Sequence, residues 1–396
     1  MSFTVPKPVI YIVRDLERAL GLPLTTKGYY IISNSTPFAK SFAKGRKNVL
    51  LIKNKELLDT RELLADTRVK RFVNKIKNAQ ILVFKNTVAI EKVCQENNWT
   101  LLNPSAALAV KVEEKVTQVE WLGELRKFLP PCEIKIAKEI KWTGNKFILQ
   151  FNRAHTGSGT ILVESEHQLK EIQTIFPERD VRVTKFIDGA MLTNNNIVWG
   201  KKVLEGNINY QITGLKPFTG MPFATIGNDW ALPHKLLNSK QKKEYSGMAQ
   251  AVGLRLAKDG WCGLFGIDVM VEKNTGKLYL IEINARQPAS TSFESQLQIK
   301  QNKKGMTTFQ AHLLAVLGAK NSGKLTMIKD GAQIIQRFVS QMKPIKNKVL
   351  PKNINIIKYN NTKSESDFIR FQSQHAIMSD VNELNSLGNK IKDYVS

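Results

Sequence analysis

Residues 280–288, LIEINARQP, place a charged or amide side chain at every second position of an otherwise apolar run. Side chains alternate between the two faces of a β-strand, so residues two apart share a face. Glu282, Asn284 and Arg286 are therefore expected on one face, while the apolar residues between them pack on the other. A hydrophobic core does not need an anionic oxygen, a neutral oxygen and a cation at one spot, so this pattern indicates a functional site.

A second acidic residue, Asp268, lies in the strand-like run FGIDVMV. The turn-like segment EKNTGK connects this run to the strand of Glu282, and the two strands are predicted to form a hairpin. Their pairing would bring Asp268 near Glu282 and Asn284. Two carboxylates and an amide oxygen suit Mg²⁺, whose octahedron is then completed by water and phosphate. The alternative is a solvated acidic residue at a strand end, and the sequence favours the metal site.

A glycine-rich segment, FNRAHTGSGTILV over residues 151–163, lies between two β-rich runs. Glycine lets backbone N–H groups approach phosphate oxygens and form an anion-binding nest. An ordinary mobile turn is the alternative. The segment is neither a Walker A loop nor a dinucleotide fingerprint, because no Gly-Lys-Ser/Thr and no helix follows it. The candidate phosphate-binding residues here are His155, Thr156, Gly157, Ser158, Gly159 and Thr160.

The composition predicts a folded protein of two or three domains, with 396 residues, 42% apolar residues and six Trp. No run reaches the ~18 apolar residues of a membrane helix, and the N-terminus lacks a secretory layout. A cytoplasmic protein without a membrane partner is therefore expected. The three cysteines are far apart, and the sequence favours reduced thiols over a zinc or redox site.

The net charge of +25, from 59 basic and 34 acidic residues, raises the possibility of a nucleic-acid or other polyanionic partner. The basic residues are mostly lysines spread along the chain, and no Arg stripe interleaved with aromatic residues accompanies them. Solvated lysine-rich surfaces are the favoured interpretation. The sequence disfavours a nucleic-acid partner, while the charge remains compatible with one.

The first ~110 residues alternate β-rich runs with amphipathic segments, which predicts an α/β unit with a largely parallel sheet. Residues 105–128 then read as one helix, which the prolines after it would end. A second unit contains clearer strands and one long amphipathic helix over residues 238–259. Its predicted strands lie at 146–151, 159–163, 181–187, 195–204, 266–271 and 277–283.

The order of a glycine-rich strand hairpin, VTKFIDG, a long helix, GIDVMV and LYLIEINAR resembles the ATP-grasp superfamily. The Glu-x-Asn-x-Arg strand is similar to that of biotin carboxylase and carbamoyl-phosphate synthetase. The resemblance implies an α/β fold, α+β in the ATP-binding part, with a Rossmann-like pre-ATP-grasp domain before a two-lobed ATP-grasp domain. The implied boundaries are 1–112 for the pre-ATP-grasp domain, 113–340 for the ATP-grasp domain (small lobe 113–183, large lobe 184–340) and 341–396 for a C-terminal extension.

The resemblance also implies roles for individual residues. Asp268 and Glu282 would coordinate Mg²⁺, or Mn²⁺, with Glu282 bridging two ions and Asn284 holding the second. Arg286 would stabilise charge on the substrate carboxyl group or acyl phosphate. The glycine-rich segment would close over the β- and γ-phosphates of ATP.

Further nucleotide contacts follow from the same resemblance. Lys115 matches a lysine that contacts ATP phosphates. Lys185, Phe186 and Ile187 match the hinge between the lobes, where backbone groups reach the adenine. Asp188 is the available substitute for an acidic ribose contact that the sequence lacks.

The sequence departs from the family at position 150 as well. Gln150 stands where the family has a second phosphate-binding lysine, and Lys146 or Arg153 is a candidate for supplying the missing charge.

The implied function is ATP-dependent activation of a small-molecule carboxylate for attack by an amine or similar nucleophile. One rival is a non-catalytic nucleotide-binding protein, for which Gln150 is the main argument. The other is the polyanion-binding protein suggested by the charge. The sequence does not identify the substrates, the oligomeric state or the role of residues 341–396.

Overall fold

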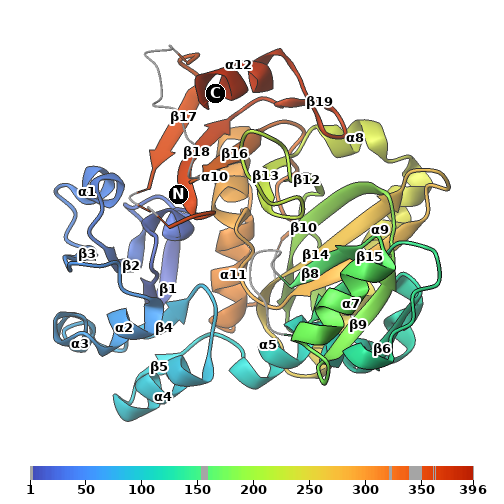
Figure 1. Ribbon diagram of the computed structural model, residues 1–396. Coiled ribbons are helices and arrows are strands. Elements are labelled where there is room, and N and C mark those ends of the chain that lie inside the picture. The colour runs from blue at the N-terminus through green and yellow to red at the C-terminus, as the bar shows by residue number, and fades with distance from the viewer. Residues whose placement is uncertain are drawn as a thin grey trace.

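The computed structural model describes residues 3–152, 159–320, 323–338, 350–359, 361 and 363–395. Three principal sheets organise these residues. Figure 1 shows the N-terminal sheet and the smaller antiparallel sheet on opposite sides of helix α11 (Thr308–Val316), while the large antiparallel sheet extends from beside the smaller sheet to above the N-terminal sheet. No helix among the described residues is both long and apolar enough to span a bilayer.

The N-terminal sheet has five parallel strands in the order β3-β2-β1-β4-β5, which confirms the predicted parallel α/β unit. Buried aliphatic side chains cover both of its faces. Helices α2, α3 and α4 pack on one face, and α1 with α11 on the other. The bounds are β1 (Thr4–Ile12), β2 (Lys27–Asn34), β3 (Val49–Ile52), β4 (Gln80–Val83), β5 (Thr100–Leu101), α1 (Pro37–Ala43), α2 (Thr60–Ala65), α3 (Thr67–Asn74), α4 (Val88–Glu96) and α11 (Thr308–Val316).

The predicted single helix over residues 105–128 is wrong. The structure has α5 (Ala106–Glu113), α6 (Lys115–Leu122) and a 3₁₀ turn over Gly123–Phe128. Glu114 separates α5 from α6 with an extended backbone, ψ 132°. The Asn152 side chain stabilises this break, because its Oδ1 accepts from Val116 N at 3.0 Å and its Nδ2 donates to Glu114 Oε2 at 2.7 Å.

The smaller antiparallel sheet has the strand order β6-β9-β7-β8. Helix α7 packs against it through Leu169 and Ile172, which meet Leu149 and Val181 of the sheet in one core. The bounds are β6 (Cys132–Ile136), β7 (Phe147–Phe151), β8 (Thr160–Val163), α7 (Glu166–Ile175) and β9 (Asp180–Lys185), with a 3₁₀ turn over Ala137–Glu139.

The large antiparallel sheet has the order β15-β14-β10-β12-β13-β16-β18-β17, and β11 pairs with β10. Helix α9 packs on one face and α11 on the other, because alternate residues of β10 and β14 contact each helix. Residues 354–373 add the last two strands, so the segment predicted as a C-terminal extension takes part in this sheet. The bounds are β10 (Gly189–Trp199), β11 (Lys202–Leu204), β12 (Asn209–Thr213), β13 (Thr225–Asp229), β14 (Gly263–Glu272), β15 (Leu278–Asn284), β16 (Ala332–Arg337), β17 (Ile354–Lys358), β18 (Asp367–Ser373) and α9 (Ser239–Lys258).

The remaining described elements are the 3₁₀ turn Leu16–Ala19, α8 (Leu232–Leu236), α10 (Thr291–Gln301), β19 (Met378–Asp380), β20 (Glu383–Leu384) and α12 (Ser386–Val395). Asn238 caps α9 through a reciprocal capping box with Gln241, so the helix begins one residue after the predicted bound.

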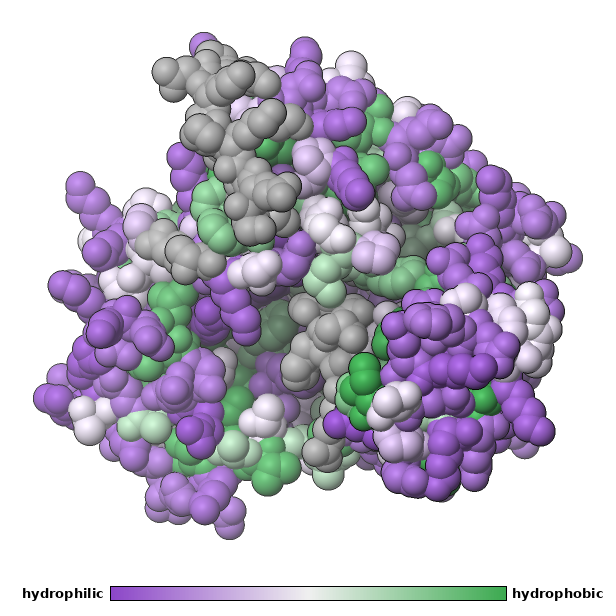
Figure 2. Space-filling model, in the orientation of Figure 1, coloured by the Kyte–Doolittle hydropathy of each residue, from purple (hydrophilic) through white to green (hydrophobic). Residues whose placement is uncertain are grey.

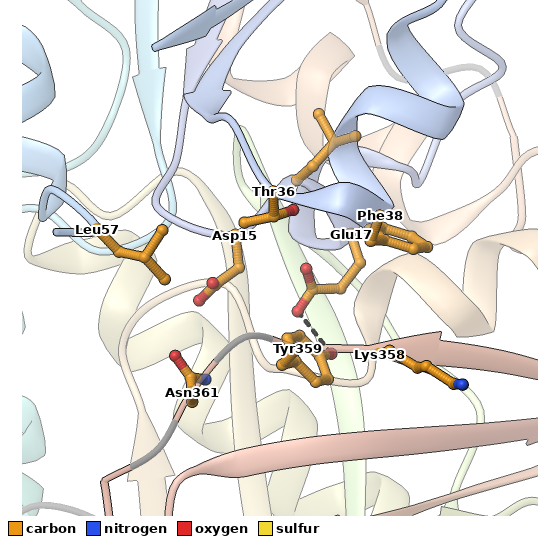
Figure 3. Close-up of a pocket in the computed structure, with 9 residues that line it drawn as sticks. Asp15, Glu17, Thr36, Phe38, Leu57, Lys358, Tyr359 and Asn361 are labelled. Atoms are coloured by element: carbon orange, nitrogen blue, oxygen red, sulfur yellow. Dashed lines mark hydrogen bonds between the residues drawn. The ribbon is translucent and has the colours of Figure 1, made fainter. Parts of the chain in front are cut away.

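Buried hydrogen bonds fix the N-terminal sheet to the rest of the molecule. Tyr11 Oη donates to Gln287 Oε1 at 2.7 Å, and Gln287 Nε2 donates to Arg18 O at 3.0 Å. A second hydrogen bond joins the N-terminal unit to the segment after β17, where Tyr359 Oη donates to Glu17 Oε1 at 2.8 Å (Figure 3). Both residues line a small cavity of about 10 Å³. Burial raises the pKa of the neighbouring Asp15 carboxyl to about 6.

Candidate nucleotide and metal site

The two strands of the predicted hairpin are β14 and β15, and their register confirms the pairing. Asp268 lies opposite Glu282, and Gly266 lies opposite Asn284. The ladder shifts by one residue between Asp268 and Val269, at the position of the acidic pair. The hairpin therefore places the two carboxylates side by side on neighbouring strands.

Lys115 reaches this pair from the first turn of α6. Its Nζ lies 2.8 Å from Glu282 Oε1, and the two side chains are 13% and 35% exposed. Burial favours the neutral amine and lowers the pKa of Lys115, despite the opposing charge of Glu282. Burial would raise the pKa of Glu282, but the charge and hydrogen bond of Lys115, followed by the charges of Arg286 and Arg182, hold it below its usual value. Glu282 is therefore an anion with cations around it.

Asp268 is the more protected carboxylate. Burial, followed by repulsion from Glu282, raises the pKa of Asp268 to about 6, against the hydrogen bond from Thr193. Asn284 Nδ2 donates to Asp268 Oδ2 at 3.3 Å. The amide thus links the two strands on the side of the hairpin that carries the acids.

Arg286 completes the row that the sequence predicts. Its Nη1 donates to Asn284 Oδ1 and to Glu113 Oε1, the latter at 3.1 Å. Glu113 Oε2 also accepts from Lys85 Nζ at 2.6 Å. The last residue of α5 therefore fixes the direction of Arg286.

Gln150, the departure from the family, has an unexpected partner. It faces Arg182 across the β7–β9 ladder, and its Oε1 accepts from Arg182 Nε at 2.8 Å and Nη2 at 2.5 Å. Arg182 Nη2 also donates to the carbonyl oxygen of Ile281, in the strand of the large sheet that carries Glu282, at 3.0 Å. Sequence reasoning missed Arg182, because only the strand register shows that it faces Gln150.

Of the two residues proposed to replace the missing lysine, Lys146 contacts an aromatic ring instead of Gln150. Lys146 is exposed, and its Nζ lies over the ring of Phe186, 4.3 Å from the centroid. Arg153 lies outside the described residues.

The predicted hinge residues connect β9 to β10. Lys185 ends β9, and its Nζ lies 3.8 Å from Glu272 Oε1. Ile187 is buried and Asp188 is exposed. Gly189 then begins β10 where only a glycine fits, because a Cβ atom there would lie 2.0 Å from the carbonyl oxygen of Val271.

The glycine-rich segment is described only in part. His155, Thr156, Gly157 and Ser158 lie outside the described residues. The carbonyl oxygen of Gly159 accepts from Phe151 N at 2.9 Å, and Thr160 Oγ1 accepts from Gln150 Nε2 at 3.4 Å. The described ends of the segment are thus held together as a strand hairpin.

In the assembled site, carboxylate and amide oxygens lie next to the positively charged side chains of Lys115 and Arg286. Two oxygens proposed to hold a metal, Glu282 Oε1 and Asn284 Oδ1, already contact cationic groups. No cluster of three or more His, Cys, Asp or Glu side chains in the described part of the chain could hold a metal ion. Two carboxylates with an amide suit a metal that takes its other ligands from water and phosphate.

A family model of an ATP-grasp domain matches residues 112–290. This stretch is an ATP-grasp domain. It includes the hairpin acids, Lys115, Gln150 and Arg182. The N-terminal parallel sheet precedes the ATP-grasp domain, and strands β16 to β18 follow it. No curated protein matches the sequence.

Solved structures extend the likeness over the whole chain. An N5-carboxyaminoimidazole synthase from Aspergillus clavatus, in complex with ADP and 5-aminoimidazole ribonucleotide, has a TM-score of 0.65 at 14% identity, covering 98% of each chain. The N5-carboxyaminoimidazole synthetase from Staphylococcus aureus, complexed with ADP, has a TM-score of 0.65 at 13% identity, covering 100% of this chain and 99% of that one.

A third solved structure is the biotin carboxylase domain of the Hydrogenobacter thermophilus 2-oxoglutarate carboxylase, in complex with MgADP, ADP and bicarbonate. Its TM-score is 0.64 at 13% identity, covering 93% of this chain and 86% of that one. The likeness to all three establishes a shared fold in which an N-terminal α/β unit precedes the ATP-grasp domain. In the space-filling view, the surface is mostly hydrophilic and is hollowed between the N-terminal unit and the smaller sheet (Figure 2).

Proposed function

We propose that this protein is an ATP- and Mg²⁺-dependent ligase that activates a small-molecule carboxylate for attack by an amine or similar nucleophile. The observation that carries the proposal is the hairpin register, which sets Asp268 beside Glu282 with Asn284 and Arg286 along the same strand. The ATP-grasp domain and the nucleotide complexes of its structural neighbours support this function.

Each group has a role in this proposal. Asp268, Glu282 and Asn284 would hold Mg²⁺, which neutralises charge on the ATP phosphates when bound. Lys115 would turn from Glu282 to a phosphate oxygen, exchanging one anionic partner for another. The glycine-rich segment from His155 to Thr160, of which Gly159 and Thr160 are described, would close over the β- and γ-phosphates.

The proposed reaction needs positioning and charge stabilisation more than a covalent nucleophile on the protein. The substrate carboxylate attacks the γ-phosphorus, ADP leaves, and an acyl phosphate forms. The amine then attacks the acyl carbon, phosphate leaves, and the amine loses a proton. Arg286, held in place by Glu113, would stabilise the charge that develops on the acyl group.

We also retain the proposed division of the chain. The pre-ATP-grasp domain would span residues 1–112, the ATP-grasp domain 113–340 and the C-terminal extension 341–396. The small lobe, residues 113–183, would hold Lys115 and Gln150, and the large lobe, residues 184–340, would hold the hinge residues and the metal ligands.

The metal site is tested by replacing Glu282 with alanine and, conservatively, with glutamine. We expect both variants to lose the Mg²⁺-dependent part of ATP binding, because the negative charge of the carboxylate is removed in each. Calorimetric titration with ATP, with and without Mg²⁺, measures this. Glu133→Ala is a matched control, since Glu133 is an exposed carboxylate paired with Lys135 at 2.7 Å in the smaller sheet. Unchanged Mg²⁺ dependence in both Glu282 variants contradicts the site.

Catalysis is tested by screening ADP release against pairs of carboxylates and amines. The ligase proposal expects release that requires both members of one pair. ATP binding without release across a broad panel supports a non-catalytic nucleotide-binding protein instead. Steeply salt-dependent binding of DNA or RNA, together with no ATP binding, supports the polyanion-binding alternative.

A further inference from the structure

The guanidinium of Arg182 is a buried positive charge that no carboxylate contacts directly in the described part of the chain, although Glu282 attracts it from nearby. Arg182 is 2% exposed. Its four hydrogen bonds go to Gln150 Oε1, twice, to Gln118 Oε1 at 3.2 Å and to the carbonyl oxygen of Ile281. All of these acceptors are neutral, and no ion pair joins Arg182 to a carboxylate in the described part of the chain. A charge removed from water in this way is costly unless an opposite charge compensates it.

The position of this guanidinium points to the missing partner. Arg182 faces Gln150, the residue that stands where the family resemblance places a phosphate-binding lysine. Its hydrogen bond to Ile281 O brings it next to Glu282, and its charge lowers the pKa values of both Lys115 and Glu282. Arg182 thus lies between the smaller sheet and the proposed metal pair, where the phosphates of a nucleotide would be bound.

The chemistry of the neighbours keeps this charge available. A carboxylate at position 150 would form a buried ion pair with Arg182 and cancel its charge. The amide oxygen of Gln150 instead orients the guanidinium without neutralising it. A guanidinium is also suited to bind phosphate oxygens, and an incoming phosphate would take over N–H donors that neutral acceptors now hold.

We propose that Arg182 binds a phosphate group of the nucleotide and takes the place of the lysine that is absent at position 150, with Gln150 as its positioning residue. This inference rests on the proposed nucleotide-binding function and extends it to a residue on a different strand. The cation has moved from β7 to the facing position of β9, and the site has kept its positive charge.

The experiment measures the affinity of the full chain for MgADP and for adenosine, which lacks the phosphates, by calorimetric titration. The main variant is Arg182→Gln. The second is the exchange Gln150→Lys with Arg182→Gln, which returns the cation to β7. Arg179→Gln is the control, because Arg179 precedes the same strand and its guanidinium stacks on Phe176 at 4.8 Å.

We expect Arg182→Gln to weaken MgADP binding by about 10- to 100-fold, the range for a hydrogen bond to a charged group. Adenosine binding should stay within about twofold of the parent protein, and the exchange variant should regain most of the MgADP affinity. MgADP affinity equal to that of Arg179→Gln overturns the inference. An equal loss of adenosine affinity also overturns it, because it would assign Arg182 to packing between the lobes. So does an exchange variant whose MgADP affinity is no higher than that of Arg182→Gln.

Gln150→Glu keeps the test decisive if Arg182→Gln does not fold. A carboxylate at position 150 gives Arg182 an internal counter-ion, so we expect a higher melting temperature together with weaker MgADP binding. Unchanged MgADP affinity in this variant overturns the inference. Failure of the Arg182 inference can be distinguished from failure of the ligase proposal. A parent protein that binds MgADP but does not release ADP from ATP contradicts the ligase proposal and still allows the Arg182 test. A parent that binds no MgADP overturns both.

Discussion

Glu113 holds two cations with one carboxylate. Its Oε1 accepts from Arg286 and its Oε2 from Lys85, and its side chain is 13% exposed. Arg286 therefore depends on a residue outside its own strand for its direction. Arg286 is proposed to act on the reacting acyl group and not on the nucleotide. Displacing it should therefore change the reaction rate without changing the affinity for MgADP.

Replacing Glu113 with glutamine should lower the rate of ADP release by about tenfold, because Arg286 loses a charge-assisted hydrogen bond. The affinity for MgADP should stay unchanged. Steady-state ADP release and calorimetric titration measure the two quantities. Glu178→Gln is the control, because Glu178 pairs with Lys138 on the surface at 2.7 Å. A loss of MgADP affinity equal to the loss of rate would show that Glu113 supports the nucleotide site instead.

Among individual residues, the sequence predicts the shared face of Glu282, Asn284 and Arg286, but it does not predict which side chains contact them. Glu282, Asn284 and Arg286 follow the two-residue period of a strand, which needs no knowledge of the partner strands. Arg182 and Glu113 were not predicted, because their roles depend on strand register and on helix packing across the site. Gln150 was recognised only as a departure, and its partner on the facing strand explains it.

The break between α5 and α6 is the local feature that places Lys115. An uninterrupted helix would give Lys115 a different direction, whereas the extended Glu114 begins a new helix at Lys115. Asn152, at the end of β7, bonds both sides of this break. The strand that leads to the glycine-rich segment thus also orients Lys115, the lysine proposed to bind phosphate.

Asn152→Ala should destabilise the protein by about 1 kcal/mol, the usual cost of losing a helix cap, and should also weaken MgADP binding. Chemical denaturation and calorimetric titration check the two effects. Ser105→Ala is the matched control, since Ser105 caps the start of α5 by accepting from Leu108 N at 3.3 Å. It should cost similar stability and leave the affinity unchanged. A parallel loss of affinity in both variants would contradict a specific role for the break.

The helix caps show which element boundaries a sequence can predict. Thr87 and Asn238 cap α4 and α9 through their own neighbouring residues, so the local sequence carries the signal. The cap that divides residues 105–128 comes from Asn152, far along the chain. No local pattern marks that break, and the helical periodicity continues across it.

Helix α11 connects the N-terminal sheet to the large sheet. Phe309 and Leu313 belong to the core of the first, while Ala311 and Ala315 pack against the second. His312 fastens the helix to β14, because its Nδ1 accepts from Leu264 N at 3.2 Å. Gly263, with φ +91°, leaves room for the ring, since a Cβ atom there would lie 2.5 Å from Nδ1.

This contact makes stability depend on pH. Burial lowers the pKa of His312 to about 3, from an ordinary value near 6.5. Between these values the unfolded chain binds a proton that the folded protein excludes, so stability falls as pH falls below about 6.5. For His312 alone, the loss from about pH 7.5 to about pH 5 is about 2 kcal/mol.

His312→Asn tests this dependence, because the amide oxygen of asparagine can accept from Leu264 N but does not titrate. We expect the variant to be less stable than the parent at about pH 7.5, and the gap to narrow by about 2 kcal/mol at about pH 5. Urea denaturation at both pH values measures the gap. Titration of other groups, such as Asp15, is common to both proteins and cancels. A gap that does not change with pH would contradict a neutral, buried His312.

For the whole molecule, alternation of strands and helices predicts the N-terminal parallel sheet, and the resemblance predicts the two lobes. The final strands were not predicted. β17 has five residues, and residues 341–396 show weak apolar patterning, so this segment looks like an appendage. The place of β17 and β18 in the large sheet depends on pairing with β16, which the local sequence does not encode.

This pairing has a consequence for synthesis on the ribosome. Strand β16 is shielded on one side by β13 and on the other by β18, which is translated some 30 residues later. Until β18 emerges, β16 presents its backbone N–H and C=O groups as an open template for a neighbouring polypeptide. A message truncated between these two strands would therefore yield an aggregation-prone chain with an unpaired sheet edge, which chaperones would bind or proteases degrade.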